Sequence, residues 1–334
     1  MKLGDQNVLV TGGAGFIGSH LVDVLIEGGF SVVVLDNLRN GSRANLAGQS
    51  ASPRLRFTQG DILDLDTCLR ACRGVSLVFH LACLGVRHSL HSPIENHQVN
   101  ALGTLNVLQA ARAVKAQRFV YVSTSEVYGR ATDFPIRETT ATWPLTVYGA
   151  SKLAGEHYTR AYCESFGLPA ICVRPFNSFG PRSHFEGDTG EVIPRFILRA
   201  LSGQPPVIFG DGSHSRDFLY VRDCAEALLQ IAASDALLGQ VVNLGFGQET
   251  RIDTLARAVL QAVGRTDLEP VHERDRPADV PRLWVDTSKL RAAVPFRPKI
   301  PLDQGIAFTL DHFRKLLAEN PRCLEQITTR NWEG

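Results

Sequence analysis

Several features that mark large classes of protein are missing from this sequence. The 35 Lys and Arg residues nearly balance the 34 Asp and Glu residues, and a formal net charge of +1 provides no overall field for nucleic acid. No apolar run approaches the roughly 20 residues that a membrane-spanning helix needs. Residues 1–7 are polar and lead directly into a strand-like segment, so we expect no signal peptide. We therefore expect a cytoplasmic protein with no nucleic-acid or membrane partner.

Paired cysteines and metal-ligand spacings are also absent. Seven cysteines is an odd number in a chain too long to need disulfides, and no Cys-x-x-Cys pair occurs. Cys68 and Cys72 lie one helical turn apart, a spacing typical of two small apolar residues that face a sheet. We predict a protein of a reducing compartment that binds no metal.

The composition is that of a globular protein of about two domains, since the chain has 334 residues and a domain usually has roughly 150. In the first half, short apolar runs bounded by turn residues alternate with helical segments such as 14–27. This pattern is typical of parallel strands buried on both faces. The predicted strands are 8–11, 31–35, 55–59, 77–81, 119–123 and 170–173.

Such βαβ units predict an α/β fold with a doubly wound parallel sheet of the Rossmann type. After Pro175 glycine and proline become denser and helical segments predominate. We expect a first, nucleotide-binding domain over residues 1–176 and a smaller, mainly helical substrate domain over residues 177–334. A segment near 215–245 is expected to return to the first domain. The predicted helices of the second part are 192–201, 222–233, 252–263 and 302–317.

A glycine-rich loop, Thr11–Gly18, follows the first strand and opens the first helix. Gly12 permits a tight turn, Gly15 lets the backbone approach a pyrophosphate, and Gly18 allows close packing of helix on strand. The amides at that helix start favour an anion. Asp36 ends the second strand, where an acid accepts hydrogen bonds from an adenosine ribose and repels a 2′-phosphate. We therefore predict NAD rather than NADP.

Two of these assignments have plain structural alternatives. Asp36 could instead cap the next turn together with Asn37, and Asp61, which we place near the adenine amine, could be an ordinary helix N-cap. The full set of residues that we predict to bind NAD is Gly12, Gly15, Phe16, Ile17, Gly18, Asp36, Asn37, Asp61, Ile62, Leu81, Ala82, Tyr148 and Lys152.

Tyr148 and Lys152 are four residues apart at the start of a predicted helix and so share one face. A nearby ammonium lowers the pKa of a phenol, which would make Tyr148 a base near neutral pH, and the same ammonium can bind the nicotinamide ribose. The segment Ser123–Glu126 supplies a hydroxyl at the carboxyl end of the fifth strand, where open α/β sheets place their ligands.

These segments together resemble an extended short-chain dehydrogenase/reductase of the nucleotide-sugar epimerase/dehydratase family. The matching segments run in order through most of the chain: TGGAGFIG at 11–18, Asp36, GDI at 60–62, HLA at 80–82, STSEVYG at 123–129, YGASK at 148–152, RPFNSFGPR at 174–182 and SRDFLYV at 215–221. The resemblance implies an NAD-dependent enzyme that acts on a nucleoside diphosphate sugar. Retention of the tyrosine and lysine argues against a non-catalytic NAD sensor, and Asp36 and the arginines argue against a freely exchanging reductase.

The resemblance also implies roles for individual residues. Thr124, Tyr148 and Lys152 would form the catalytic set, and the substrate would meet Asn177 at its diphosphate, Arg216 and Arg276 at its phosphates and Asp279 at its nucleotide ribose. Planar guanidinium groups suit a diphosphate because they bind it bidentately. In this family the loop after the fourth strand borders the sugar, so Arg87 or His88 could meet a C6 group. The alternative is that both belong to a solvated loop. The same two interpretations apply to His184.

Glu126 bears on the reaction. Simple 4-epimerases usually have a small neutral residue here, whereas nucleotide-sugar dehydratases and glucuronate decarboxylases usually have glutamate. A 4-ketone acidifies the C5 hydrogen, and a carboxylate can remove that proton before water leaves C6. The chain departs from the dTDP-glucose dehydratases at Ser125, where they have the aspartate that serves as the acid for the C6 hydroxyl. We favour dehydration, with a 4-epimerase and then a decarboxylase as alternatives; Glu126 could also be a buried carboxylate bonded to backbone or cofactor.

By the same resemblance we expect a homodimer in which the helices near 101–113 and 149–165 pair across a two-fold axis. The apolar residues compatible with this contact are Leu102, Leu105, Leu108, Ala154, Tyr158 and Ala161.

Overall fold

A seven-stranded parallel sheet forms the centre of the computed structural model, which describes residues 6–330 and 332. The strand order is β10-β6-β5-β4-β1-β2-β3, and every neighbouring pair is parallel. This order confirms the predicted doubly wound sheet. The strands are β1 Asn7–Thr11, β2 Ser31–Asp36, β3 Leu55–Gln59, β4 Leu77–His80, β5 Arg118–Val122, β6 Ala170–Pro175 and β10 Val241–Leu244.

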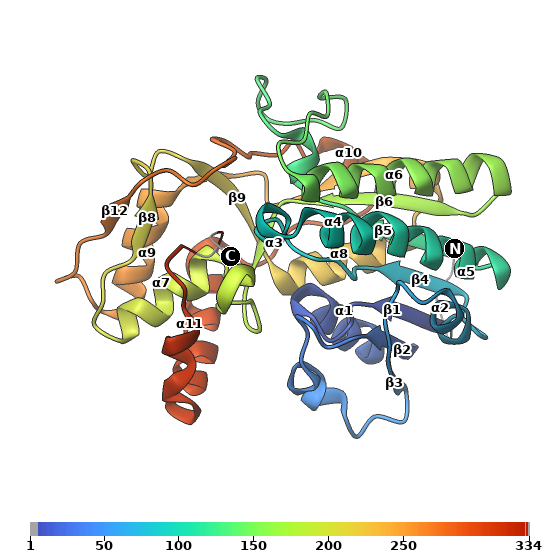
Figure 1. Ribbon diagram of the computed structural model, residues 1–334, viewed down its shortest axis with the longest axis horizontal. Helices are drawn as coiled ribbons and strands as arrows, with labels where there is room; N and C mark the ends of the chain where they lie inside the picture. Colours follow the sequence, from blue (N-terminus) through green and yellow to red (C-terminus); the bar gives the residue numbers. More distant parts are fainter. Residues whose placement is uncertain (1–5, 331, 333–334) are drawn as a thin grey trace.

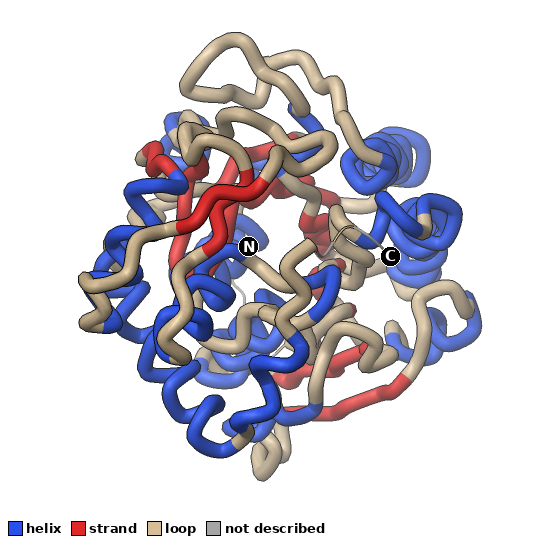
Figure 2. The backbone as a smooth tube through the Cα atoms, turned by 60° about the vertical axis from the view of Figure 1, so that its left-hand side comes forward, coloured by secondary structure: helices blue, strands red, loops and turns tan. Residues whose placement is uncertain are grey.

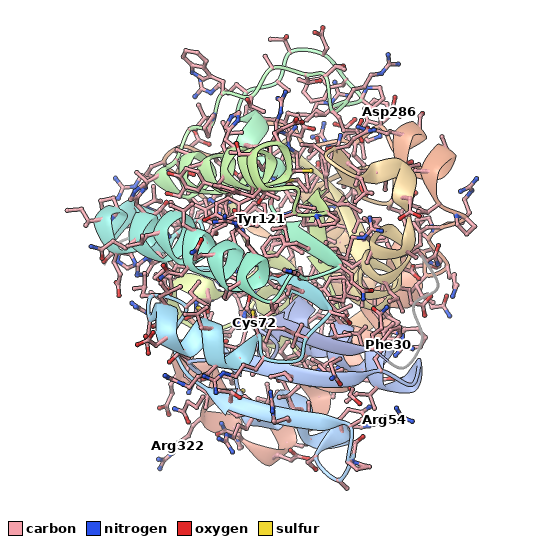
Figure 3. All side chains as sticks on the ribbon, turned by 90° about the vertical axis from the view of Figure 1, so that its right-hand side faces the viewer. Phe30, Arg54, Cys72, Tyr121, Asp286 and Arg322 are labelled. Atoms are coloured by element: carbon pink, nitrogen blue, oxygen red, sulfur yellow. The ribbon has the colours of Figure 1, made fainter. Side chains whose placement is uncertain are left out.

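Alternate residues of the inner strands enter two different hydrophobic clusters, which is why these strands are mainly apolar, whereas the edge strand β3 carries Arg56, Thr58 and Gln59. In β1, Val8 and Val10 pack on one face, and Leu9 packs on the other. Cys72 and Tyr121, both labelled in Figure 3, belong to the second cluster, between the sheet and its helices. Cys68 lies there as well, as its spacing predicted.

Helices cover both faces of the sheet, and the tube view shows them outside the strands (Figure 2). Helices α1 and α8 pack against each other on one face, and α2, α5 and α6 form a row on the other. In chain order, the helices through α6 are α1 Phe16–Glu27, α2 Leu65–Ala71, α3 His88–His91, α4 Pro93–His97, α5 Gly103–Ala113 and α6 Val147–Phe166. A π-helical segment, Gln98–Leu102, joins α4 to α5.

Three further helices surround a separate hydrophobic cluster to one side of the sheet (Figure 1). The short strands β9 Ser215–Tyr220, β7 Asn177–Phe179 and β11 Glu249–Arg251 form a sheet beside this cluster, and β8 Val207–Phe209 pairs with β12 Val271–Glu273. The sequence analysis did not predict these strands, four of which have only three residues. The helices are α7 Val192–Leu201, α9 Ile252–Val263 and α11 Leu302–Glu319.

The chain returns to the first sheet after β9. Helix α8 Val221–Ala233 covers the face that α1 also covers, strand β10 pairs with β6, and α10 Ser288–Ala293 packs against β10. Strand β9 itself stays with β7, although it lies within the segment 215–245 that was expected to return. Because of this crossing, we keep the division at residues 176 and 177 as a proposal.

Candidate active site

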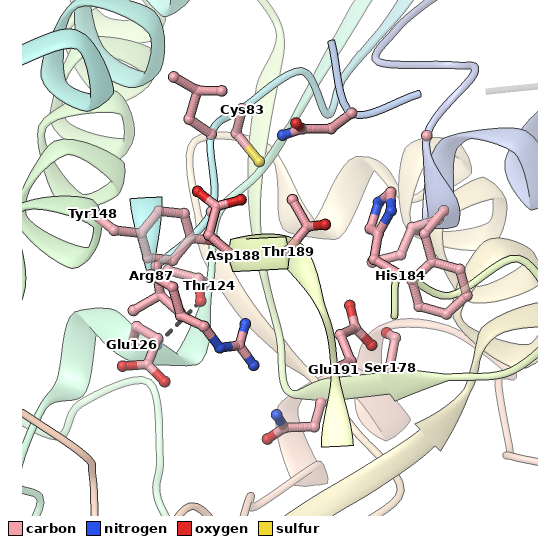
Figure 4. A pocket seen from close by; sticks show the side chains of 18 of the residues that line it. Cys83, Arg87, Thr124, Glu126, Tyr148, Ser178, His184, Asp188, Thr189 and Glu191 are labelled. Carbon is pink, nitrogen blue, oxygen red and sulfur yellow. Dashed lines mark hydrogen bonds between the residues drawn. The ribbon is translucent and has the colours of Figure 1, made fainter. Parts of the chain in front are cut away.

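A cavity of about 490 Å³ lies between the carboxyl ends of the parallel strands and the second group of helices. The loops after β1 to β6 form one wall, and the loop before α7 together with β8, β9 and segment 276–279 forms the other. Figure 4 shows residues from both walls, among them Tyr148 and Glu126 on one side and His184 and Glu191 on the other. Open α/β sheets place their ligands at this edge.

The glycine loop can be formed only by residues without a side chain at two positions. Gly12 has a φ of +70°, and a methyl group there would lie 2.7 Å from the backbone nitrogen of Ala82. A methyl group on Gly18 would lie 2.1 Å from the Gly12 carbonyl oxygen. Gly15 caps α1 without any side-chain hydrogen bond, so the first-turn amides remain available at the cavity wall. This cradle suits a pyrophosphate.

Asp36 lies at the cavity wall and also binds backbone. Its carboxylate accepts hydrogen bonds from the amides of Ala14 (2.9 Å) and Leu38 (2.8 Å). Burial raises its pKa, and both hydrogen bonds oppose that shift. Each oxygen retains a second acceptor direction, so the turn-capping role and the predicted ribose role are compatible.

The predicted adenine-binding residue Asp61 is held in a similar way. It accepts hydrogen bonds from the side chain of Asn37 (2.9 Å) and the amide of Leu63 (2.8 Å). Asn37, Asp61 and Ile62 line the cavity beside Asp36. The N-cap of α2 is Asp64 and not Asp61, so the helix N-cap that we gave as the alternative is not observed. Asp61 closes the turn before that residue, and its contact with adenine stays a prediction.

A buried hydrogen-bonded chain, which the sequence analysis missed, holds the loop after β4 against the glycine loop. His80 Nδ1 lies 2.7 Å from the Thr11 hydroxyl, and its Nε2 lies 3.0 Å from the Thr104 hydroxyl. Burial lowers the pKa of His80 to about 3, so the ring is neutral. The amide of Ala82 donates to the Thr11 oxygen at 3.3 Å, which positions Leu81 and Ala82 at the cavity.

Tyr148 and Lys152 lie on the first turns of α6, whose N-cap Thr146 accepts a hydrogen bond from the Gly149 amide. The buried Lys152 ammonium donates to the Val122 carbonyl (2.7 Å). We expected a lowered pKa for Tyr148, but burial raises it, and a hydrogen bond with Thr124 only partly opposes this. The expectation was wrong because desolvation of the phenol dominates, and the nearby Glu126 and Glu191 act in the same direction.

A buried ion pair fixes the strand ends beneath this helix. Glu156, one turn after Lys152, binds Arg174 of β6 bidentately at 2.8 and 2.6 Å. The hydroxyl of Ser123 donates to the same carboxylate at 2.6 Å. Helix α6, β6 and the end of β5 are thereby joined directly below Thr124.

Thr124 and Glu126 follow β5 at a short 3₁₀ turn, and the Thr124 hydroxyl accepts a hydrogen bond from the Glu126 amide (3.2 Å, Figure 4). Within residues 6–330 no hydrogen bond reaches the Glu126 carboxylate, so it is not bonded to backbone. Burial raises its pKa, and Arg216 is the strongest opposing charge. The carboxylate is therefore available to a ligand in the cavity.

The predicted nucleotide-binding residues form a group on the opposite wall. Asp279 accepts hydrogen bonds from Arg216 (2.7 Å) and from Arg276 (2.8 Å). Burial tends to raise the pKa of Asp279, but the two guanidinium groups outweigh it and the pKa is lowered. The side-chain oxygen of Asn177, also at the cavity, is buried without a hydrogen-bond partner.

Of the two neighbouring residues after β4, only Arg87 reaches the cavity. Arg87 lines it, its Nε is buried without a partner, and burial lowers its pKa to about 9. His88 is not among the lining residues; it packs under the loop, 3.2 Å from Arg39 Nη2 and 3.2 Å from Glu95 Oε2. His88 therefore does not line the cavity, because its buried ring packs against Arg39 and Glu95, and its contact with the substrate stays a prediction. His184 does line the cavity.

The sequence analysis singled out no residue between 185 and 215, yet several from this stretch reach the cavity. Glu191 and Arg195 lie at the start of α7, and burial raises the pKa of Glu191 to about 8. The only feature of the sequence that could have indicated Glu191 is a carboxylate in a glycine-containing loop, and such loops are common on protein surfaces. Cys83, beside Tyr148 and Lys152, was missed as well.

Two absences apply to the part of the chain that the structure describes. In residues 6–330 and 332 no group of three or more His, Cys, Asp and Glu side chains is placed to hold a metal ion. Over the same residues, no helix has both the length and the apolar character needed to cross a bilayer.

Comparison with known proteins decides the family. Residues 8–245 match the model of the NAD dependent epimerase/dehydratase family. The chain belongs to this family. The resemblance inferred from the sequence is confirmed, and NAD is its cofactor. The glycine cradle, the available first-turn amides and the loop after β4 fit this dinucleotide, with Gly12, Gly15 and Asp36 as the residues that would hold it.

Relatives within the family differ in their reactions. The chain is 37% identical to a UDP-glucose 4-epimerase of Mycolicibacterium smegmatis, over 92% of this chain and 99% of the relative. It is 35% identical to a dTDP-glucose 4,6-dehydratase of Neisseria gonorrhoeae, over 93% and 96%. The structure of the dTDP-glucose 4,6-dehydratase DesIV of Streptomyces venezuelae, with NAD and TYD bound, has a TM-score of 0.89 at 32% identity, covering 94% of this chain and 99% of DesIV.

Proposed function

We propose that the protein is a nucleotide-sugar 4,6-dehydratase that converts a nucleoside diphosphate hexose into its 4-keto-6-deoxy derivative. The observation that carries this proposal is the unbonded Glu126 carboxylate, which lines the same cavity as Thr124 and Tyr148. A base at this position serves a reaction that removes a proton from carbon, and simple epimerisation at C4 does not require one.

Tyr148 is the proposed base for the C4 hydroxyl, with Thr124 as its hydrogen-bonding partner. Bound NAD would supply the hydride acceptor for oxidation at C4 and, once reduced, the hydride donor that completes the reaction. Lys152 is held by Val122 at the cavity floor, from where its remaining donors can reach the nicotinamide ribose. The phenol must lose its proton in a site where burial disfavours the anion, so ligand binding has to supply positive charge or hydrogen bonds.

The nucleotide end of the substrate is assigned to the wall formed by Arg216, Arg276 and Asp279. Arg216 and Arg276 share a single carboxylate, so the group retains positive charge for two phosphates. The unpartnered oxygen of Asn177 and the unpartnered Nε of Arg87 are further polar groups that a sugar diphosphate would satisfy.

Glu126 is the proposed base for the C5 proton once C4 carries a ketone. In the Glu126→Gln variant, oxidation at C4 persists while proton removal fails. We expect NADH absorbance to rise on addition of substrate and product formation to fall roughly 10²–10⁴-fold, the usual value of a positioned base. Mass spectrometry of the products from a panel of UDP-, GDP- and dTDP-sugars identifies the substrate for this assay.

The matched control is Glu164→Gln, which makes the same change on an exposed position of α6 and should leave turnover unchanged. Wild-type enzyme in deuterated water should place deuterium in a product that has lost the mass of water. A Glu126→Gln variant that dehydrates at the wild-type rate contradicts the assignment.

The second candidate is a nucleotide-sugar 4-epimerase, which the similarity to the epimerase of M. smegmatis favours. The hydride then leaves and returns at the same carbon. The product has unchanged mass and no deuterium, and Glu126→Gln has little effect on turnover. A uronate decarboxylase, the third candidate, is recognised by loss of the mass of carbon dioxide.

A further inference from the structure

Seven acidic side chains line the cavity, and they divide into two kinds. Five have hydrogen-bond partners for their carboxylates within residues 6–330: Asp36 and Asp61 with backbone amides, Glu95 with Arg39, Asp188 with His91, and Asp279 with Arg216 and Arg276. The carboxyl groups of the other two, Glu126 and Glu191, have none in that part of the chain. A dehydration requires one base and one acid, and two carboxyl groups are available.

Glu191 reaches the cavity from the wall opposite to Glu126 (Figure 4). It is the N-cap of α7, and its backbone amide donates to the His184 carbonyl at 2.8 Å, which closes the loop 184–191. A methyl group on Gly190 would lie 2.6 Å from the Phe185 carbonyl oxygen, so the loop is tightly packed directly before Glu191. The carboxyl group is thus presented by a fixed backbone.

The charged groups around Glu191 allow it to carry a proton. Arg87, from the segment before α3, is the cation that faces it, and Tyr148 faces it from α6. Arg195, one turn further along α7, hydrogen-bonds the carbonyls of Thr328 and Thr329 instead. Burial outweighs Arg87 and raises the pKa of Glu191 to about 8, which keeps the group protonated at neutral pH. Burial raises the pKa of Glu126 as well, but Arg216 and Arg276 oppose that shift in addition to Arg87, which alone opposes it at Glu191. Such unequal environments of two carboxyl groups distinguish acid from base.

We propose that Glu191 is the general acid that protonates the C6 hydroxyl as it leaves. This inference rests on the proposed dehydratase function. It supplies the acid that Ser125 cannot provide. The C5 proton passes to Glu126, the electron pair of that C–H bond forms the C5–C6 double bond, and the C6–O bond breaks with its pair on oxygen. The proton of Glu191 joins that oxygen, which departs as water and leaves Glu191 as a carboxylate.

The first test is the Glu191→Gln variant, which preserves size and hydrogen bonding but carries no transferable proton. It should still oxidise C4, seen as NADH absorbance, and should still exchange the C5 hydrogen with deuterated water through Glu126. Loss of water should fall roughly 10²–10⁴-fold. Glu186→Gln, on the same loop but outside the cavity, is the control and should dehydrate at the wild-type rate.

The second test changes the leaving group. Fluoride departs without a proton, so the 6-deoxy-6-fluoro analogue of the wild-type substrate should be eliminated by Glu191→Gln at a rate within about tenfold of wild type. Glu126→Gln should eliminate neither leaving group. With the natural substrate the wild-type rate should fall as the pH rises through about 8, where Glu191 loses its proton, and the fluoro analogue should not show this fall.

The outcomes separate the two proposals. Normal dehydration by Glu191→Gln, or equal defects with hydroxyl and fluoro substrates, overturns the role of Glu191 while leaving the dehydratase function in place. A wild-type product of unchanged mass overturns the function itself. If Glu191→Gln loses bound NAD or unfolds at a lower temperature, Glu191→Ala and the fluoro analogue in wild-type enzyme still decide, since only an acid produces a leaving-group-dependent pH profile.

Discussion

The two walls of the cavity are built in different ways. The cofactor wall consists of short continuous segments that directly follow consecutive parallel strands: 11–18, 36–41, 60–63 and 81–85. The sugar wall collects single residues from positions far apart in the chain, such as Glu191, Arg216, Arg276 and Asp279. On the first wall the backbone is the binding element, whereas on the second wall the side chains are.

This difference determines how each wall responds to amino-acid substitution. The cofactor wall depends on close contacts between backbone atoms, which leave no room for a methyl group at Gly12 or Gly18. The sugar wall depends on ion pairs such as those that join Arg216 and Arg276 through Asp279, and their geometry can adjust when a ligand binds. Substitutions on the first wall should therefore affect assembly of the holoenzyme, and substitutions on the second should affect substrate choice and chemistry.

The largest effect is expected from Gly18→Ala. The added methyl group would lie 2.1 Å from the Gly12 carbonyl oxygen and 2.9 Å from the Gly13 Cα, so the loop or the helix must move. Overpacking of this kind costs typically 1–3 kcal/mol of stability, and the displaced amides should lose the pyrophosphate. We expect purified protein with little or no bound NAD and a lower melting temperature, measured by absorbance of extracted cofactor and by calorimetry.

Gly48→Ala is the matched control, because no atom lies within 4 Å of the added methyl group. It should retain NAD and the wild-type melting temperature. A Gly18→Ala protein that retains a full complement of NAD would show that the cofactor wall is more adaptable than its packing indicates.

The sequence predicted the cofactor wall better than the sugar wall for a physical reason. Glycine spacing and strand ends are local features, and a parallel sheet brings them to one edge. In the loop after β4, Arg87 and His88 are neighbours in the chain, and the packing of His88 against Arg39 and Glu95 leaves Arg87 as the one that lines the cavity. Glu191 lies on a loop whose course depends on His184, and no local pattern encodes that contact.

For the buried polar groups, too, the sequence predicted positions in the chain but not the partners. The motif at 80–82 marked the position of His80, but the pairing of His80 with Thr11 and Thr104 depends on residues from three separate elements.

Among the apolar residues, Leu108 was expected at a subunit contact, whereas it is fully buried against the sheet. Helical periodicity shows that a face is apolar but does not tell which partner covers it.

A smaller effect is expected from substitution of Asp36, which lies on the cofactor wall and acts on the cofactor through its charge. Asp36→Ala should lower the preference for NAD over NADP, because a 2′-phosphate no longer meets a carboxylate. A charge pair 4 Å apart interacts by about 1 kcal/mol in water and about 4 kcal/mol near a protein surface, so the preference should fall about fivefold or more. Titration of cofactor-free protein with both dinucleotides measures it.

Asp36→Asn separates charge from structure, since its amide oxygen can still accept one of the hydrogen bonds from Ala14 and Leu38. It should change the preference as Asp36→Ala does, with less loss of affinity for NAD. An unchanged preference in both variants would remove Asp36 from the ribose site and leave its turn-capping role.

The smallest effect on the two walls is expected from substitutions at the homodimer contact that we propose, on the outer face of α6, α5 and the end of the preceding π-helical segment. Leu102 remains 49% exposed in the single chain, and Leu105, Ala154 and Tyr158 are half-buried around it. Leu108 points to the sheet and no longer belongs to this set. An apolar face left open in one copy suits the same face of a second copy across a two-fold axis.

We expect light scattering to give twice the mass of one chain at micromolar concentration. Leu102→Glu should weaken the dimer by about tenfold or more, since truncation or charging of a central interface residue commonly costs 2 kcal/mol or more. Bound NAD and the rate of C4 oxidation should stay near wild type, because Leu102 lies outside both walls of the cavity. Leu238→Glu makes the same change at another exposed leucine, 37% exposed, and should leave the dimer intact. A single-chain mass for the wild type would remove the contact, and a weakened dimer with Leu238→Glu would move it to a different face.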